Sequence, residues 1–185
     1  MKDLKLLVLD VDGILTDGRK NYSANGTVIS KQFCDLDFSA IKIFTALGVN
    51  VILLTGDSWN MCLQTSRSIK TYVSRAEDGT PIDKGSMLNK LSQIHEVNCD
   101  QIWYAGDDLF DLPAFTFAKY SSAPTNAPEY VKKLTNIKIN EASGNYFVSK
   151  MLERYISETG IVIDDQIINK VLYLDSQEAT SKNMA

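Results

Sequence analysis

The hydrophobic positions of the chain form short continuous runs that alternate with amphipathic stretches. Four runs predict buried strands, at residues 4–9, 49–54, 72–75 and 101–105. Apolar residues at helical spacing predict helices over residues 39–47, 58–69, 83–97, 109–118, 127–134 and 144–155. A short strand is expected between the helices at 109–118 and 127–134, and an edge strand at 137–139. This alternation predicts an α/β, Rossmann-like fold, in which a parallel sheet carries helices on both faces.

One segment interrupts the alternation. Residues 19–33 read RKNYSANGTVISKQF, and Asn25-Gly26 lies between β-prone flanks, which predicts a small β-hairpin directly after the first strand. A longer insertion at this place would form a cap over an active site, but a hairpin of this size cannot close a site alone. We therefore expect one domain over residues 1–155 with this hairpin and no cap domain. Residues 156–185 form a C-terminal extension that ends in SQEATSKNMA and is predicted to be partly frayed.

Composition and charge argue against several classes of protein. The chain has 44% hydrophobic and 23% charged residues, and its net charge of −4 includes no basic block, so we expect no nucleic-acid partner. No apolar run approaches the roughly 18 residues of a membrane helix, and the first is too short for a signal peptide. The three cysteines, Cys34, Cys62 and Cys99, match neither a disulfide framework nor a zinc site. We therefore expect a cytoplasmic protein.

Polar residues gather where three of the predicted strands end. One lysine also begins the helix that follows the strand at 72–75. The carboxyl ends of parallel strands meet at one edge of a sheet, where ligands bind in open α/β folds. The residues that we expect to converge there are Asp10, Asp12, Thr55, Gly56, Lys84, Asp107, Asp108 and Asp111.

This set of residue types suits phosphoryl transfer. Asp10 is an oxygen nucleophile at a strand end, and Asp12, two residues on, can protonate a leaving group and then activate water. Crowded acids repel one another and need a cation, and oxygen ligands indicate Mg²⁺. Thr55, Gly56 and Lys84 supply a hydroxyl, a backbone N–H and a positive charge, which suit the oxygens of a phosphoryl group.

Each motif taken alone has a plainer interpretation. Asp-x-Asp is more often a solvated turn, Thr55-Gly56 can be an ordinary turn, and Lys84 can simply begin a helix on the surface. Asp108 and Asp111 can be acids that favour a helix N-terminus. Four such motifs in order at the ends of strands favour the functional interpretation.

The same four motifs resemble those of the haloacid dehalogenase (HAD) superfamily of phosphotransferases. They are DVDG at 10–13, the Thr of LLTG, Lys84, and GDDLFD at 106–111, and the resemblance covers about residues 4–155. DVDGILTDG, a short hairpin and GDDLFDLP without a cap domain are similar to the capless 3-deoxy-D-manno-octulosonate 8-phosphate (KDO8P) phosphatases. They are also similar to relatives that act on 2-keto-3-deoxy-nononate 9-phosphate.

The resemblance implies a role for each acid in the first and last motifs. Asp10 would be the nucleophile that forms an aspartyl-phosphate, and Asp12 the general acid and base. Mg²⁺ would be held by the Asp10 carboxylate, the Asp12 backbone carbonyl and Asp107. Asp108 and Asp111 would lie behind these ligands and help to orient Lys84 and the waters of the metal.

The resemblance also implies a phosphate site, a substrate and an assembly. Thr55, Gly56 and Lys84 would bind the phosphate of a phosphorylated sugar acid. Capless members of the family form tetramers in which hairpins associate at the centre and a neighbouring subunit helps to cover each site. The hairpin at 19–33 would thus make the chain a homotetramer.

Two stretches depart from the family pattern. KDO8P phosphatases commonly carry Arg-Asp-Gly after the hairpin, where this chain reads CDLDFSAIK. They also commonly read Thr-Gly-Arg after the second strand, and the nononate enzymes read Thr-Gly-Glu, whereas this chain reads Thr55-Gly56-Asp57. The acid at 57 points away from the KDO8P enzymes, so the sequence defines the type of reaction better than the substrate.

Other functions fit parts of the sequence. Domains similar to this one are fused to sialic-acid cytidylyltransferases and mainly drive assembly, so an oligomerisation module is one alternative. The retained Asp10, Asp12, Lys84 and Asp107 argue against it. A HAD phosphatase for a different phosphomonoester, including a nucleotide or a protein, is another. A signalling receiver domain fits poorly, because the strand predicted at 72–75 ends without an acid.

Overall fold

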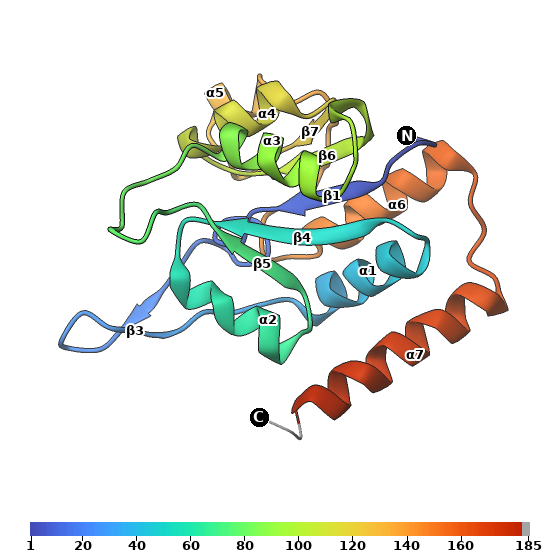
Figure 1. Ribbon diagram of the computed structural model, residues 1–185, viewed down its shortest axis with the longest axis horizontal. Coiled ribbons are helices and arrows are strands. Elements are labelled where there is room, and N and C mark those ends of the chain that lie inside the picture. The colour runs from blue at the N-terminus through green and yellow to red at the C-terminus, as the bar shows by residue number, and fades with distance from the viewer. Residues whose placement is uncertain (183–185) are drawn as a thin grey trace.

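A five-stranded parallel sheet forms the centre of the structure, a computed structural model that describes residues 1–182 (Figure 1). The strand order is β5-β4-β1-β6-β7, and each neighbouring pair is parallel. The strands are β1 (Leu6–Leu9), β4 (Asn50–Thr55), β5 (Lys70–Val73), β6 (Ile102–Ala105) and β7 (Tyr120–Ser122). Every residue of β1 and β6 is buried, which explains their continuous apolar sequence.

Helices cover both faces of the sheet, as the sequence predicts. On one face, Leu7 packs in a core with Phe44 and Met151, from α1 and α6. On the other face, Leu6 packs in a core with Leu88, from α3. The covering helices are α1 (Asp35–Ala46) and α6 (Phe147–Thr159) on the first face, and α3 (Lys84–Ile94) and α4 (Leu112–Phe117) on the second. The remaining helices are η1 (Ser58–Met61), α2 (Cys62–Ser66), η2 (Cys99–Gln101), η3 (Leu109–Asp111), α5 (Glu129–Lys132) and α7 (Asp165–Lys182).

The predicted hairpin is present after the first strand. Strands β2 (Asn21–Tyr22) and β3 (Val28–Ser30) pair antiparallel, and the hairpin protrudes from the body of the molecule (Figure 1). Gly26 adopts a φ of +81° in the connecting turn, a conformation that glycine takes without strain. The side chains of Tyr22 and Ile29 are 59% and 62% exposed.

The CDLDFSAIK stretch belongs to the core of the fold. Helix α1 begins at Asp35, four residues before the predicted start, and its first turn contains Asp35 and Asp37. Asp37 is fully buried, and its Oδ1 accepts a hydrogen bond of 2.9 Å from the backbone N–H of Ser149 in the first turn of α6. A side chain of α1 thus provides a hydrogen-bond acceptor for a backbone N–H group in the first turn of α6, which has no acceptor within its own helix. Asp37 thus has a structural role within the core.

Several expected elements have different bounds or are absent. The helix expected at 58–69 is divided into η1 and α2 and ends at Ser66, and the third strand begins two residues earlier than predicted. The edge strand expected at 137–139 does not form, so that prediction was wrong. Ile137 instead donates one backbone hydrogen bond to Ser121 and packs against the core, as does Ile139. Apolar spacing identified these residues as buried but not their backbone pairing.

The structure describes the C-terminal extension as far as residue 182. Residues 165–182 form helix α7, and residues 183–185, the end of the stretch expected to be frayed, lie outside the described residues. Helix α7 packs beside α1 and α2. The Glu178 side chain is buried there, 2.8 Å from Lys42 Nζ and 3.5 Å from Arg67 Nη1. Ion pairing joins α7 to the domain, and the hydrophobic pattern gave no sign of it. Within residues 1–182, no helix combines the length and apolar character that a membrane span requires.

We predict that Asp37→Ala lowers the free energy of unfolding by about 1–2 kcal/mol, because it removes the acceptor at the start of α6. Asp35→Ala is the matched control on the same helix, since the Asp35 carboxylate is largely exposed and pairs only with Arg67. It should change stability by about 0.5 kcal/mol or less. Urea unfolding followed by circular dichroism measures both. Equal losses would contradict the assigned role of Asp37.

Candidate active site

The carboxyl ends of β1 and β4 and the start of α3 open into a pocket of about 780 Å³. Six of the eight residues that the sequence singled out line this pocket. They are Asp10, Asp12, Thr55, Gly56, Lys84 and Asp108. The other two, Asp107 and Asp111, lie close behind Asp10. The structure therefore brings all eight predicted residues to one edge of the sheet.

Lys84 joins two buried carboxylates. Its Nζ lies 2.8 Å from Asp10 Oδ2 and 2.7 Å from Asp111 Oδ1, and all three side chains are almost fully buried. Burial lowers the pKa of Lys84, but the two carboxylates outweigh this effect and raise the pKa above its ordinary value. Lys84 is thus a fixed positive charge beside Asp10.

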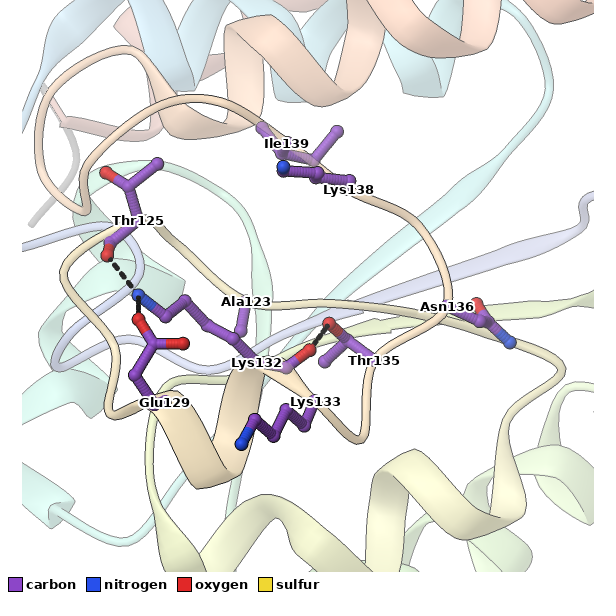
Figure 2. A pocket seen from close by; sticks show the side chains of 9 residues that line it. All are labelled: Ala123, Thr125, Glu129, Lys132, Lys133, Thr135, Asn136, Lys138 and Ile139. Atoms are coloured by element: carbon purple, nitrogen blue, oxygen red, sulfur yellow. Dashed lines mark hydrogen bonds and ion pairs between the residues drawn. The ribbon is translucent and has the colours of Figure 1, made fainter.

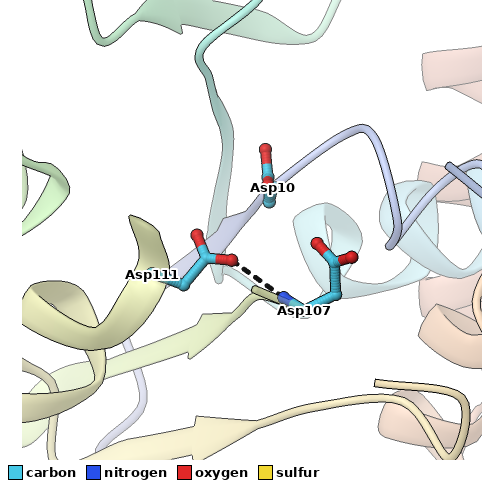
Figure 3. A group of neighbouring side chains, drawn as sticks. All are labelled: Asp10, Asp107 and Asp111. Atoms are coloured by element: carbon cyan, nitrogen blue, oxygen red, sulfur yellow. Dashed lines mark hydrogen bonds between the residues drawn. The ribbon is translucent and has the colours of Figure 1, made fainter. Parts of the chain in front are cut away.

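Asp111 is an orienting residue whose hydrogen-bonding capacity is filled. Its Oδ1 accepts from Lys84 and from the Tyr104 hydroxyl at 2.6 Å. Its Oδ2 accepts from the backbone N–H of Asp107 at 2.8 Å (Figure 3) and from that of Asp108 at 3.0 Å. Each carboxylate oxygen thus accepts hydrogen bonds from two donors, which uses the lone pairs of this carboxylate. Asp111 therefore fixes Lys84 and the loop after β6. Asp108 is the N-cap residue of η3, and its Oδ1 accepts a hydrogen bond of 2.6 Å from the backbone N–H of Phe110.

The Asp107 carboxylate occupies space that only glycine at position 13 leaves open. A Cβ at Gly13 would lie 2.0 Å from Asp107 Oδ2, and Gly13 has a φ of +92°. Among the described residues, this carboxylate makes no hydrogen bond or ion pair. It is thus free to bind a cation.

Three carboxylates meet at this point. Asp10, Asp107 and Asp111 each offer an oxygen, and these atoms lie within 4.8 Å of one another (Figure 3). Burial raises the pKa of Asp10 to about 7, where Lys84 opposes the shift and Asp111 adds to it. Burial also raises the pKa of Asp107 to about 8, with the charges of Asp10 and Asp111 adding to it. Lys84 alone does not compensate this much negative charge.

The residues present fit a magnesium ion. Asp107 has a free carboxylate, Asp10 lies beside it, and both are oxygen donors in an environment that disfavours their ionisation without a cation. The expected metal set was Asp10, Asp12 and Asp107, whereas the clustered carboxylates are those of Asp10, Asp107 and Asp111. Asp12 enters the expected set through its backbone carbonyl, so the direction of its side chain does not affect that expectation.

Thr55 and Gly56 lie at the end of β4, beside the pocket. The Thr55 hydroxyl oxygen accepts from Asn60 Nδ2 at 2.8 Å and from the backbone N–H of Asp57 at 3.1 Å. Because the oxygen is the acceptor in both bonds, its own hydrogen remains to donate into the pocket. The Gly56 carbonyl accepts from Arg75 Nε at 2.7 Å, which fixes the peptide after β4.

Asp12 faces a basic group that the sequence analysis missed. Lys31 Nζ lies 2.8 Å from both oxygens of the Asp12 carboxylate, and Asn60 Nδ2 donates to Oδ2 at 3.1 Å. Lys20 Nζ lies 3.4 Å from the same carboxylate and 2.7 Å from Asp57 Oδ2. Both lysines come from the hairpin segment and are 8 and 19 residues from Asp12, so no local spacing in the sequence connected them with the acid. The acid at position 57, a departure from the family pattern, was the available signal.

A second pocket, of about 410 Å³, lies around the loop after β7 (Figure 2). It contains Lys132, Lys133 and Lys138, but Lys132 is paired with Glu129 and donates to the Thr125 carbonyl at 2.9 Å. The lysine side chains in Figure 2 do not converge on one point. Since no group of acids or nucleophiles lines this pocket, we assign the active site to the larger one.

Comparisons with known proteins agree with this geometry, although no family model matches the chain. It is 29% identical over 162 residues to 3-deoxy-D-manno-octulosonate 8-phosphate phosphatase KdsC of Haemophilus influenzae, covering 86% of this chain and 87% of that protein. The structure of a probable YrbI family phosphatase from Pseudomonas syringae is 31% identical, with a TM-score of 0.76 and coverage of 86% and 88%. The KDO8P phosphatase of Moraxella catarrhalis, solved with magnesium, phosphate and KDO, is 26% identical, with a TM-score of 0.75 and coverage of 86% and 89%.

We predict that Mg²⁺ stabilises the protein more at about pH 8.5 than at about pH 5.5. The raised pKa values of Asp10 and Asp107 mean that, between about pH 4 and 8, the folded protein keeps protons that the unfolded chain has lost. Stability without metal therefore falls as pH rises through this range. Mg²⁺ competes with these protons, so its effect grows as they are lost.

Melting temperatures with Mg²⁺ and with chelator, at constant ionic strength, measure this difference. Asp107→Asn should reduce the increment at both pH values, because it removes the free carboxylate. An increment that is the same at both pH values, or unchanged in Asp107→Asn, would mean that the metal binds elsewhere.

Proposed function

The chain belongs to the HAD superfamily, among the phosphatases similar to KDO8P phosphatase, and on this basis we propose that it is a Mg²⁺-dependent phosphatase for a phosphorylated sugar acid. The observation that carries the proposal is the Lys84 ammonium between Asp10 and Asp111, at the mouth of a large pocket. A scaffold protein gains nothing from burying this charged group, whereas phosphoryl transfer needs it.

In the proposed reaction, the Asp10 carboxylate attacks phosphorus and forms an aspartyl-phosphate. The backbone N–H of Val11 donates to Asp10 Oδ1 at 2.7 Å, and Lys84 contacts Oδ2, so the nucleophile is held on both sides. Asp12 gives a proton to the leaving oxygen of the sugar, and then takes one from the water that attacks phosphorus and releases phosphate.

The phosphoryl oxygens would be held by groups that are already fixed. Thr55 and Gly56 line the pocket at the end of β4, where the Thr55 hydroxyl and the Gly56 backbone N–H would donate to the phosphoryl oxygens, and Lys84 would supply positive charge. Magnesium, held by Asp10, the Asp12 carbonyl and Asp107, would neutralise the negative charges of the carboxylates and the phosphoryl group.

The pocket suits an anionic sugar. Its volume of about 780 Å³ exceeds what a phosphoryl group alone needs, and Lys20 and Arg75 line it in addition to Lys84. These two cations can pair with the carboxylate of a sugar acid. The exposed side chains of Leu109 and Phe110 at the same mouth offer an apolar surface to the sugar carbons. The curated relative from Haemophilus influenzae is named as a KDO8P phosphatase, which supports this class of substrate.

We further propose that the chain assembles through its hairpin into a homotetramer, in the cytoplasm. Tyr22 and Ile29 on the hairpin are exposed and apolar, as a contact surface requires. The three cysteines are free, which suits a reducing compartment. An oligomerisation module without activity remains the alternative, and it requires only the hairpin and not the acids.

We predict that Asp10→Asn lowers kcat by on the order of a thousandfold or more, because an amide cannot form the acyl-phosphate. Phosphate release with Mg²⁺ is measured for 2-keto-3-deoxy sugar-acid phosphates, hexose phosphates and nucleotides. The wild type should prefer a sugar-acid phosphate. Circular dichroism of the nearly isosteric variant checks that it folds.

Full activity in Asp10→Asn would contradict the assignment of Asp10 as the nucleophile. Wild-type preference for a nucleotide would replace the substrate class but keep the reaction. Failure to release phosphate from any compound would favour the oligomerisation module.

We predict that the double change Tyr22→Ser and Ile29→Ser lowers the molar mass in solution from that of a tetramer to that of a monomer, because it removes the apolar surface of the hairpin. Size-exclusion chromatography with light scattering measures the mass. Tyr130→Ser is the control, since Tyr130 is similarly exposed on α5. A tetramer that survives the double change would show that assembly uses another surface.

A further inference from the structure

The most unusual charged group outside the phosphate site is Lys31. It follows β3 of the protruding hairpin, yet its side chain is 0% exposed. Charged side chains are seldom fully buried unless they are paired and hydrogen-bonded. A hairpin needs no such residue for its own stability, so the burial calls for another explanation.

The Lys31 ammonium is satisfied by three partners from two different loops. Nζ lies 2.8 Å from the Asp12 carboxylate, 3.0 Å from Asp57 Oδ2 and 2.7 Å from Asn60 Oδ1. These contacts use all three N–H donors of the ammonium. The ring of Trp59 covers the group, with its centroid 5.0 Å from Nζ. Lys31 therefore occupies one fixed position.

The contacts of Lys31 also define where the Asp12 carboxylate lies. Both oxygens of the carboxylate lie 2.8 Å from Lys31 Nζ. Asn60, whose Oδ1 accepts from Lys31, donates from Nδ2 to Asp12 Oδ2. Asn60 Nδ2 also donates to the Thr55 hydroxyl. Lys31 thus connects the proposed acid to the residue that would hold the phosphate, through a single intermediate side chain.

We propose that Lys31 is a positioning residue that holds the Asp12 carboxyl group where, in its protonated form, it can give its proton to the leaving oxygen of the substrate and become a carboxylate. The inference rests on the proposed function, because it assigns a role within that reaction. Lys31 does not line the pocket, so it acts through Asp12 and not by contact with the substrate. The hairpin then contributes to catalysis within its own subunit, apart from any part in assembly.

The dependence of the rate on the leaving group tests this role. p-Nitrophenolate departs without a proton, whereas phenolate leaves more slowly and gains more from an acid. For Lys31→Met, kcat/KM should fall at least about tenfold more for phenyl phosphate than for p-nitrophenyl phosphate. The ratio kcat/KM reports the steps up to departure of the leaving group, and the two compounds are of similar size.

Four further variants separate positioning from folding. Lys31→Arg keeps the positive charge, so its ratio of kcat/KM for phenyl phosphate to that for p-nitrophenyl phosphate should lie between those of the wild type and Lys31→Met. The double variant Lys31→Met with Asp57→Asn also removes the negative charge that pairs with Lys31. The two rates are therefore measured on this variant if Lys31→Met alone does not fold. It should regain stability but keep the altered ratio, with Asp57→Asn alone as its reference. Lys20→Met, from the same hairpin but 3.4 Å from Asp12, should shift the ratio less.

Each outcome decides a different question. Equal losses for both compounds in Lys31→Met, or a wild-type ratio in the double variant, would overturn the inference and leave the proposed function intact. A wild-type protein that releases phosphate from neither compound would contradict the proposed function, and the inference with it.

Discussion

The ion pairs of Lys84 with Asp10 and Asp111 are the interaction on which the rest of the site depends. Asp10 ends the central strand β1 and Asp111 lies after β6, so without a shared cation the parallel sheet would bring together carboxylates that repel. The backbone accommodates this arrangement only at glycines. A Cβ at Gly106 would lie 2.3 Å from Asp111 Cγ, and one at Gly13 would meet Asp107. One lysine therefore fixes the proposed nucleophile, while the Asp107 carboxylate makes no ion pair among the described residues and is the proposed metal ligand.

The hairpin links two properties that its position in the sequence does not connect. Its outer surface exposes apolar side chains, which suits assembly, and its base places Lys31 against Asp12 and Lys20 in the lining of the pocket beside Asp57. Although burial acts in the opposite direction, these two lysines hold the pKa of Asp57 well below its ordinary value. The acid that departs from the family pattern at 57 is thus paired with lysines of the same chain, which gives this protein its own arrangement of charge beside the pocket.

The sequence predicted the parallel sheet, the helices on both faces, the hairpin and the convergence of the acids, because each follows from local hydrophobic period or from strand ends. It did not predict α7 as a packed helix, since Glu178 is buried by ion pairs and not by an apolar stripe. The prediction of an edge strand at 137–139 was wrong because burial and strand pairing are separate properties. Lys31 was missed for a similar reason: a lysine in a hairpin is ordinarily exposed, and only the tertiary structure places it against Asp12.

The central claim is that Asp10 carries the phosphoryl group during turnover, and trapping this intermediate tests it most directly. The protein is mixed with Mg²⁺ and its best substrate, quenched in acid within one turnover, and reduced with borohydride, which converts an aspartyl-phosphate to homoserine. Peptide mass spectrometry then locates the reduced residue. We predict homoserine at position 10, only when substrate is present. Rapid turnover with no modification at Asp10, or with modification at another residue, would contradict the account.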